Sequence, residues 1–334
     1  MEIAAFSIVW VGLGLFALLA GADFGVGFWV LASYFTRRGE ELRRDAFGYF
    51  APVWEINFLF LVFAMVGLMG AFPRGLGLLA DTLIPLMLLA LVLFVIRSGA
   101  YALLHYGPDR GRGTATVVFG LASVVAGVSL GYTAAAPASG FITDDTLPGA
   151  FYTSPIALAA LPLTLAASAH LSALVVAAYG AVRGSGQTEW FRWAALAAGA
   201  VVLPCAALFT LAIATQVEHT AERLQGPSII PMLIGGVIIF LGTVALWRRR
   251  YARAALLTFV GYFCGLLGGA FAQLPYMVYP AMTISEAAAP ESSIFAWMLA
   301  TGLGAPLLVV AMVALYHMTL GPQRGGTGPP AGGH

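Results

Sequence analysis

Residues 12–30, GLGLFALLAGADFGVGFWV, are apolar except for one carboxylate, Asp23. They form the middle of a longer apolar run, near residues 3–34, that contains no basic residue. A spanning helix needs about 20 apolar residues, whereas a cleavable signal peptide has a basic start and a shorter apolar segment. The stretch therefore predicts the first of several membrane-spanning helices.

The composition of the whole chain is that of a membrane protein. Of 334 residues, 60% are hydrophobic and 9% are charged, and the mean hydropathy is +0.90. A soluble domain carries about 25% charged residues, so this chain has too few to cover a surface that faces water. The net charge of +1 gives no indication of nucleic-acid binding. Cys205 and Cys264 lie in apolar segments, at a spacing that fits neither a metal site nor a disulfide framework.

Nine apolar runs predict an all-α fold of about nine transmembrane helices. In hydrocarbon a helix satisfies its own backbone groups, so these runs are expected to be helical despite many glycines and β-branched residues. Residues 1–318 are therefore expected to form a single transmembrane domain, and the glycine-rich segment 319–334 a disordered tail. The expected helices lie near residues 3–34, 46–71, 78–104, 114–135, 153–181, 190–216, 228–247, 253–273 and 292–318.

The arginines are distributed unequally between the two sides of the predicted membrane. Of the 16 basic residues, Arg74 and Arg223 lie on one side, Arg97 lies within a helix, and all the others lie on the opposite side or in the tail. Cytoplasmic loops collect arginine and lysine. We therefore expect the N-terminus outside the cell and the C-terminal tail in the cytoplasm.

Three ionisable residues fall within the first three predicted helices, where a charge is costly and is a functional candidate by default. Asp23 and Glu55 each lie about ten residues from a cytoplasmic helix end, which at 1.5 Å per residue places them about 15 Å deep, near the midplane. Arg97 could pair with either carboxylate, and Asn57 could add hydrogen bonds. Two interpretations stay open: a proton path from the cytoplasm, and a static charge cluster that locks the helices together.

His170 lies near the middle of the fifth predicted helix, among small residues. It could ligate a metal or carry protons, but a lone histidine in such surroundings is more often hydrogen-bonded across a helix interface. His219 stands beside Glu218 and Glu222 in a predicted outer loop, where ordinary loop polarity explains the cluster. No metal site is predicted.

Several motifs occur in an order that resembles one family. They are ADFGVG at Ala22–Gly27, RRGEELRRDAF at 37–47, APVWEIN at Ala51–Asn57, AFP at Ala71–Pro73, FVIRSGAYALLHYG at 94–107 and AQLPYMVYPAMTISEAAAPESSIFAWML at 272–299. In this combination, over essentially the whole chain, the sequence resembles subunit II of cytochrome bd-type quinol oxidases.

The resemblance implies two four-helix bundles plus one peripheral helix, in the bacterial cytoplasmic membrane. It implies a heterodimer with a homologous subunit I, which carries two haems b and one haem d. The complex oxidises quinol and reduces dioxygen to water with cytoplasmic protons, and this chain is its haem-free subunit, not catalytic alone. Some members bind a structural quinone, and small single-helix accessory subunits are further expected partners.

Carried over to this chain, the resemblance assigns Glu55 to a proton route and matches Asp23 and Arg97 to the acid and the arginine of helices 1 and 3. Trp54 and Asn57 belong to the same motif as Glu55, and we expect them, with Arg97, to hold the structure together.

The chain also departs from the family pattern. Ala20 stands where some members have a second acid, Glu55 replaces a commoner Asp, and Ile56 and Phe58 make the surroundings drier.

Two other functions compete with the oxidase subunit. Mid-membrane carboxylates and interrupted helices also suit a stand-alone ion-coupled secondary transporter, although the sequence shows no inverted repeat. A purely structural membrane scaffold is the third hypothesis.

Overall fold

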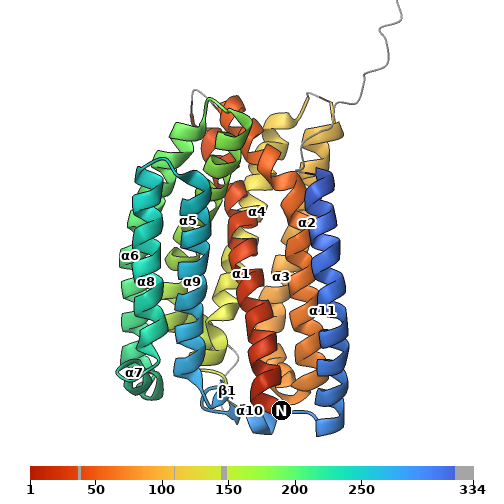
Figure 1. The fold of residues 1–334 in the computed structure, drawn as a ribbon, viewed down its shortest axis with the longest axis vertical. Helices are drawn as coiled ribbons and strands as arrows, with labels where there is room; N and C mark the ends of the chain where they lie inside the picture. Colours follow the sequence, from red (N-terminus) through yellow and green to blue (C-terminus); the bar gives the residue numbers. More distant parts are fainter. Residues whose placement is uncertain (37–38, 109, 144–148, 320–334) are drawn as a thin grey trace, which may run out of the picture.

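The computed structural model describes residues 1–36, 39–108, 110–143 and 149–319, without the side chains of 49–56, 308–309, 311–313 and 315–319. Its long helices run up and down along one direction in two adjoining groups (Figure 1). The first bundle consists of α1 (Glu2–Ser33), α2 (Gly39–Ala71), α3 (Pro73–Tyr106) and α4 (Arg112–Ala134). The second consists of α5 (Pro155–Arg183), α6 (Thr188–Gln216), α8 (Ile229–Trp247) and α9 (Tyr251–Gln273).

Helix α11 (Glu291–Thr319) stands outside both bundles and packs mainly on α2. The predicted all-α membrane fold, with two four-helix bundles and a peripheral helix, is thus confirmed. Within the described residues, seven helices are long and apolar enough to cross a membrane: α1, α3, α4, α5, α6, α8 and α9. The count of nine spans, which needs α2 and α11 as well, stays a prediction.

Helix ends follow local chemistry more closely than hydropathy. Helix α3 starts at Pro73, five residues before the predicted start, because proline suits the first turn of a helix. Helix α2 starts at Gly39, so that Arg43 lies inside the helix and not in the predicted loop. Acidic residues at Glu40 and Glu41 favour this earlier start, since they lie at the positive end of the helix dipole.

Helix α1 is the central helix of the molecule, and it packs against α2, α4, α5 and α9. Two glycines permit its closest approaches. A Cβ atom at Gly25 would lie 2.0 Å from the Ser168 carbonyl oxygen of α5, and one at Gly27 would lie 2.1 Å from Ser123 Cβ of α4. Backbones that approach this closely need glycine. Helix α1 therefore joins the two bundles through a glycine contact with α5.

The end of the molecule that holds the N-terminus carries short elements that the sequence did not predict. They are α7 (Glu218–Leu224), β1 (Tyr276–Val278), β2 (Met282–Thr283) and α10 (Ile284–Ala287). Buried Met277, Val278 and Ile284 extend the apolar core of the first bundle into this end. The segment after α9 is therefore a folded closure of the first bundle.

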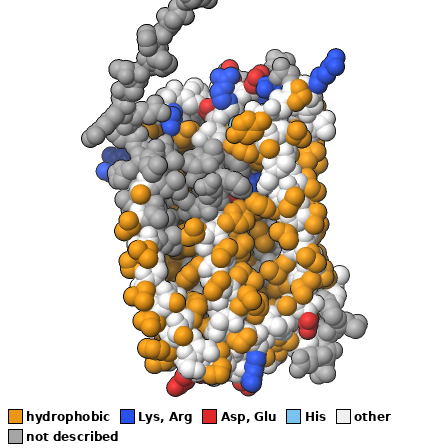
Figure 2. All heavy atoms as spheres, turned by 90° about the vertical axis from the view of Figure 1, so that its right-hand side faces the viewer, with side chains coloured by type: hydrophobic (Ala, Val, Ile, Leu, Met, Phe, Trp, Pro, Cys, Tyr) orange, Lys and Arg blue, Asp and Glu red, His pale blue; other side chains and the backbone are white. Residues whose placement is uncertain are grey.

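The surface divides into an apolar band and two charged ends. Figure 2 shows hydrophobic side chains over the length of one face, with Arg, Asp and Glu gathered at its two ends. Most of the large hydrophobic side chains exposed along the helices are leucine, isoleucine and valine. This pattern is that of a protein whose middle is in contact with lipid.

Candidate functional site

The most deeply buried charges of the described structure are Asp23 of α1 and Arg97 of α3, each 1% exposed. Arg97 donates from its two terminal nitrogens to the two carboxylate oxygens of Asp23, at 3.1 and 2.6 Å. It also donates to the Asp23 carbonyl oxygen at 3.1 Å. A two-pronged guanidinium–carboxylate pair combines charge with fixed geometry. The pair therefore ties α1 to α3 inside the first bundle.

Helix α4 completes the surroundings of the guanidinium. Arg97 Nε donates to Ser123 Oγ at 2.8 Å, and the Ser123 hydroxyl donates in turn to the Phe119 carbonyl oxygen. The rings of Phe24 and Phe119 lie 4.7 and 5.2 Å from the guanidinium carbon. Aromatic faces attract a cation, most strongly where water is excluded. Two helices, α1 and α4, thus stabilise the buried positive charge that α3 carries.

The part played by α4 was missed from the sequence. Ser123 lies among small apolar residues in a helix that carries no acid, and nothing in its neighbourhood points to Arg97. The one available signal is Gly27, which follows Asp23 by one helical turn. Its missing side chain leaves the space that Ser123 occupies.

Asn57 of α2 is fully buried, at 0% exposed. Neither atom of its side-chain amide has a hydrogen-bond partner within the described part of the chain. A buried amide without partners is costly, and such groups commonly bind an ordered water. The expected hydrogen bond from Asn57 to Asp23 or Arg97 is therefore not formed in the structure. The side chains of Trp54 and Glu55, which the sequence singled out, lie outside the described residues.

This arrangement sets limits on what Asp23 can do chemically. In the observed geometry the carboxylate accepts two donors from the same guanidinium. The adjacent guanidinium charge favours the ionised form of the carboxylate and so opposes its protonation. The pair therefore supports a static role more directly than a proton-carrying one, unless the helices move.

His170 lies apart from this site, between the helices of the second bundle. Its Nδ1 is 3.0 Å from the Tyr262 hydroxyl of α9. A Cβ atom at Gly199 of α6 would lie 3.1 Å from the other side of the ring. The histidine is thus hydrogen-bonded across a helix interface. His219 has its Nε2 3.0 Å from the Leu274 carbonyl oxygen. Among the described residues, no three His, Cys, Asp or Glu side chains gather in a way that could hold a metal ion.

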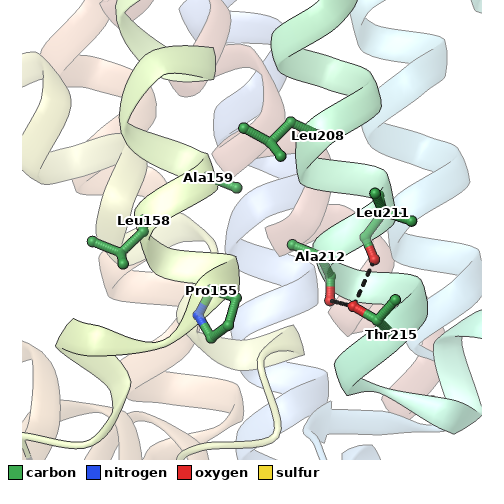
Figure 3. Close-up of a pocket in the computed structure, with 7 residues that line it drawn as sticks. All are labelled: Pro155, Leu158, Ala159, Leu208, Leu211, Ala212 and Thr215. Atoms are coloured by element: carbon green, nitrogen blue, oxygen red, sulfur yellow. Dashed lines mark hydrogen bonds between the residues drawn. The ribbon is translucent and has the colours of Figure 1, made fainter.

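An apolar groove opens between α5 and α6, with a volume of about 400 Å³. The Thr215 hydroxyl in it is used within its own helix, bonded to the Leu211 and Ala212 carbonyl oxygens (Figure 3). The groove suits a hydrocarbon chain and offers a quinone head group little polarity. A structural quinone therefore stays a prediction. The groove is lined by Pro155, Leu158, Ala159, Leu208, Leu211, Ala212 and Thr215.

The fold and the buried pair together define a polytopic helical membrane protein whose first bundle is built around an intramembrane ion pair. The chain is similar in structure to bd oxidase from Geobacillus thermodenitrificans, with a TM-score of 0.82 over 96% of this chain and 98% of that one. The two sequences are 24% identical, so this likeness shows the fold.

Sequence comparison identifies the family. The chain is 26% identical over 298 residues to the putative cytochrome bd menaquinol oxidase subunit II of Bacillus subtilis (strain 168), covering 84% of each protein. The family model for cytochrome bd terminal oxidase subunit II matches residues 1–319. The chain belongs to this family. It is therefore a membrane-embedded subunit of a terminal oxidase complex, as the sequence motifs predicted.

Proposed function

We propose that this chain is the haem-free subunit II of a cytochrome bd-type quinol oxidase, which supports the haem subunit and contributes a proton route from the cytoplasm. It has no activity alone. The haems b and d are held by subunit I, and the complex oxidises quinol and reduces dioxygen to water. Small accessory subunits and a structural quinone complete the proposed assembly. The N-terminus faces outward and the C-terminal tail the cytoplasm, in line with the arginine distribution.

The observation that carries this proposal is the buried polar group of the first bundle. The Asp23–Arg97 pair and the Asn57 amide, which has no hydrogen-bond partner among the described residues, put fixed charge and a site for water within one apolar bundle. Such groups are expensive in a membrane and are rarely kept without a function. Glu55 is the acid of the APVWEIN motif on α2 of the same bundle, and the family resemblance of that motif favours it as the group that exchanges protons.

The haem-free assignment is supported by the surroundings of His170. Its Nδ1 faces the Tyr262 hydroxyl, and the backbone of α6 closes the opposite side of the ring at Gly199. A porphyrin plane needs open space next to the coordinating nitrogen. The close approach of α6 leaves none at this histidine.

The experiment is co-expression with the partner subunit and purification of the complex. We expect a haem b and d complex that consumes oxygen with quinol, and no haem in this chain purified without its partner. A stable, haem-free, oxygen-inert preparation that shows solute uptake in proteoliposomes would instead favour the transporter.

The proton route has its own test in Glu55→Gln. We expect the haem content and the yield of complex to stay near the parent values while turnover falls. Glu291→Gln is the control, since that carboxylate is exposed at the start of α11. Unchanged turnover in an assembled Glu55→Gln complex would remove the proton role and leave a scaffold.

A further inference from the structure

The turn between α8 and α9 is held in an unusual backbone conformation. Arg249 has φ 58°, in the left-handed region that usually requires glycine. The amide of Arg249 donates to the Leu246 carbonyl oxygen at 3.0 Å, and that of Arg250 donates to the Ala245 carbonyl oxygen at 2.8 Å. These two bonds form the helix-ending motif in which glycine normally takes the left-handed position. Arginine is less favourable than glycine in this conformation. Its presence at position 249 therefore indicates that the side chain makes a contact that glycine could not.

That role is to attach the turn to α6 through Glu189. Arg249 Nε lies 3.3 Å from Glu189 Oε1, and the Tyr251 hydroxyl donates to the same oxygen at 2.6 Å. Arg192 pairs with the second carboxylate oxygen at 2.8 Å. One carboxylate thus fixes the turn, and its charge is shared between two arginines.

Three further arginines of this turn are left exposed: Arg248, Arg250 and Arg253. Within the described part of the chain, none of the three has a carboxylate partner. They lie on a short, fixed segment at the end of the molecule opposite the N-terminus (Figure 1). A strong positive charge is therefore presented at one place on the surface.

Two tryptophans stand next to this charge. Trp193 of α6 and Trp247 of α8 meet edge to face, with ring centroids 5.6 Å apart. They are 52% and 62% exposed, and the guanidinium of Arg192 lies 4.5 Å from the Trp193 ring centroid. Tryptophan concentrates at the level of lipid headgroups, where its ring is apolar and its N–H reaches water. The pair marks the depth of the membrane interface on this face.

We propose that Arg248, Arg250 and Arg253, with Trp193 and Trp247, form a binding site for the phosphate headgroup of an anionic phospholipid. Guanidinium groups match phosphate oxygens in geometry and keep their charge. The tryptophan rings lie beside the glycerol and upper acyl chains. Exposed rings facing hydrocarbon favour a lipid over a water-soluble anion. The site is independent of the proposed oxidase function.

The experiment uses the purified complex, delipidated in detergent, with its dissociation constant for diphosphatidylglycerol measured by native mass spectrometry. The test variant is Arg248→Gln/Arg250→Gln/Arg253→Gln. We expect binding to weaken by roughly fivefold for each arginine removed. The matched control is Arg44→Gln/Arg110→Gln/Arg183→Gln, which removes the same charge from exposed residues elsewhere. The control should bind as the parent does.

A second variant, Trp193→Leu/Trp247→Leu, keeps every charge. It tests the proposed lipid site even if the arginine variant fails to assemble. It should weaken diphosphatidylglycerol binding and leave binding of phosphatidylcholine unchanged. Equal losses in the arginine variant and its control would show attraction by net charge alone and overturn the proposal. Inorganic phosphate that binds as tightly as the lipid, with no effect of the tryptophans, would also overturn it.

Discussion

The two four-helix bundles are alike in architecture and differ in what their interiors hold. The first contains a full ion pair, Asp23–Arg97, at 1% exposure. The second contains a histidine and a tyrosine, His170 and Tyr262, hydrogen-bonded to each other. Burying a charge is far more expensive than burying a paired neutral group. The first bundle therefore depends on a charge interaction for its stability, whereas the second depends on a single polar contact between two helices.

The largest effect is expected when one member of the ion pair is removed, and this change tests directly whether the first bundle depends on its buried charges. Arg97→Met leaves the Asp23 carboxylate buried without its counter-charge, which costs about 3–5 kcal/mol. We expect little assembled complex, and a much lower melting temperature for what is recovered, measured by thermal unfolding in detergent.

The matched variant is Asp23→Leu/Arg97→Met, which replaces both charges with apolar groups of similar size. It should recover most of the lost stability, because apolar replacements of a buried pair are often neutral. If Arg97→Met alone were as stable as the parent, this result would contradict the view that the pair is fixed in a dry interior.

The second prediction concerns the contact that joins the bundles. Gly25→Ala places a methyl group 2.0 Å from the Ser168 carbonyl oxygen, so α1 and α5 must separate. Overpacking of this kind costs about 1–3 kcal/mol, and the melting temperature should fall accordingly. Gly99→Ala is the control, because a Cβ there meets nothing within 4 Å. Similar melting temperatures for the two variants would show that the bundles are not tightly joined at Gly25.

The sequence predicted the helices better than it predicted the site. Hydropathy alone located the helices, since a spanning helix must be apolar for about 20 residues. It also singled out Asp23 and Arg97, because charges are conspicuous in such segments. Ser123 and the rings of Phe24 and Phe119 could not be predicted. Their contacts with Arg97 depend on the rotations of α1 and α4 about their axes, and helices apolar on nearly all sides carry little sign of those rotations.

The folded closure after α9 was also missed, for a different reason. Its elements are short, and their pairing depends on contacts with distant helices. The Tyr279 amide donates to the Pro137 carbonyl oxygen, and the Ala289 amide donates to the Ala71 carbonyl oxygen. Nothing local in the sequence specifies these partners.

A third prediction tests the hydrogen-bonded pair His170 and Tyr262 of the second bundle. Tyr262→Phe removes the hydroxyl that faces His170 and keeps the ring. A single hydrogen bond contributes about 0.5–1.5 kcal/mol, so we expect a modest fall in melting temperature and unchanged oxygen consumption. A loss of turnover in an assembled Tyr262→Phe complex would show that the second bundle takes part in the chemistry, and the contrast between the bundles would fail.

The smallest expected effect lies at α10, which packs on α1 and α3 of the first bundle. Hydrogen bonds from the Thr283 amide and then from its hydroxyl, at 2.8 and 2.7 Å, lower the pKa of Glu286. A lowered pKa in the folded state gives stability that is complete above the ordinary pKa and is lost as the pH falls through the lowered one. The parent should therefore melt slightly above Glu286→Gln at neutral pH, and this difference should disappear in acid. Glu291→Gln changes the same charge without removing a capping bond. Thr283 and Glu286 bond to each other's side chain and backbone at the start of α10, an arrangement called a capping box. If the melting-temperature difference from the parent did not change with pH, or were the same for Glu286→Gln and Glu291→Gln, the capping box would not hold the closure on the first bundle.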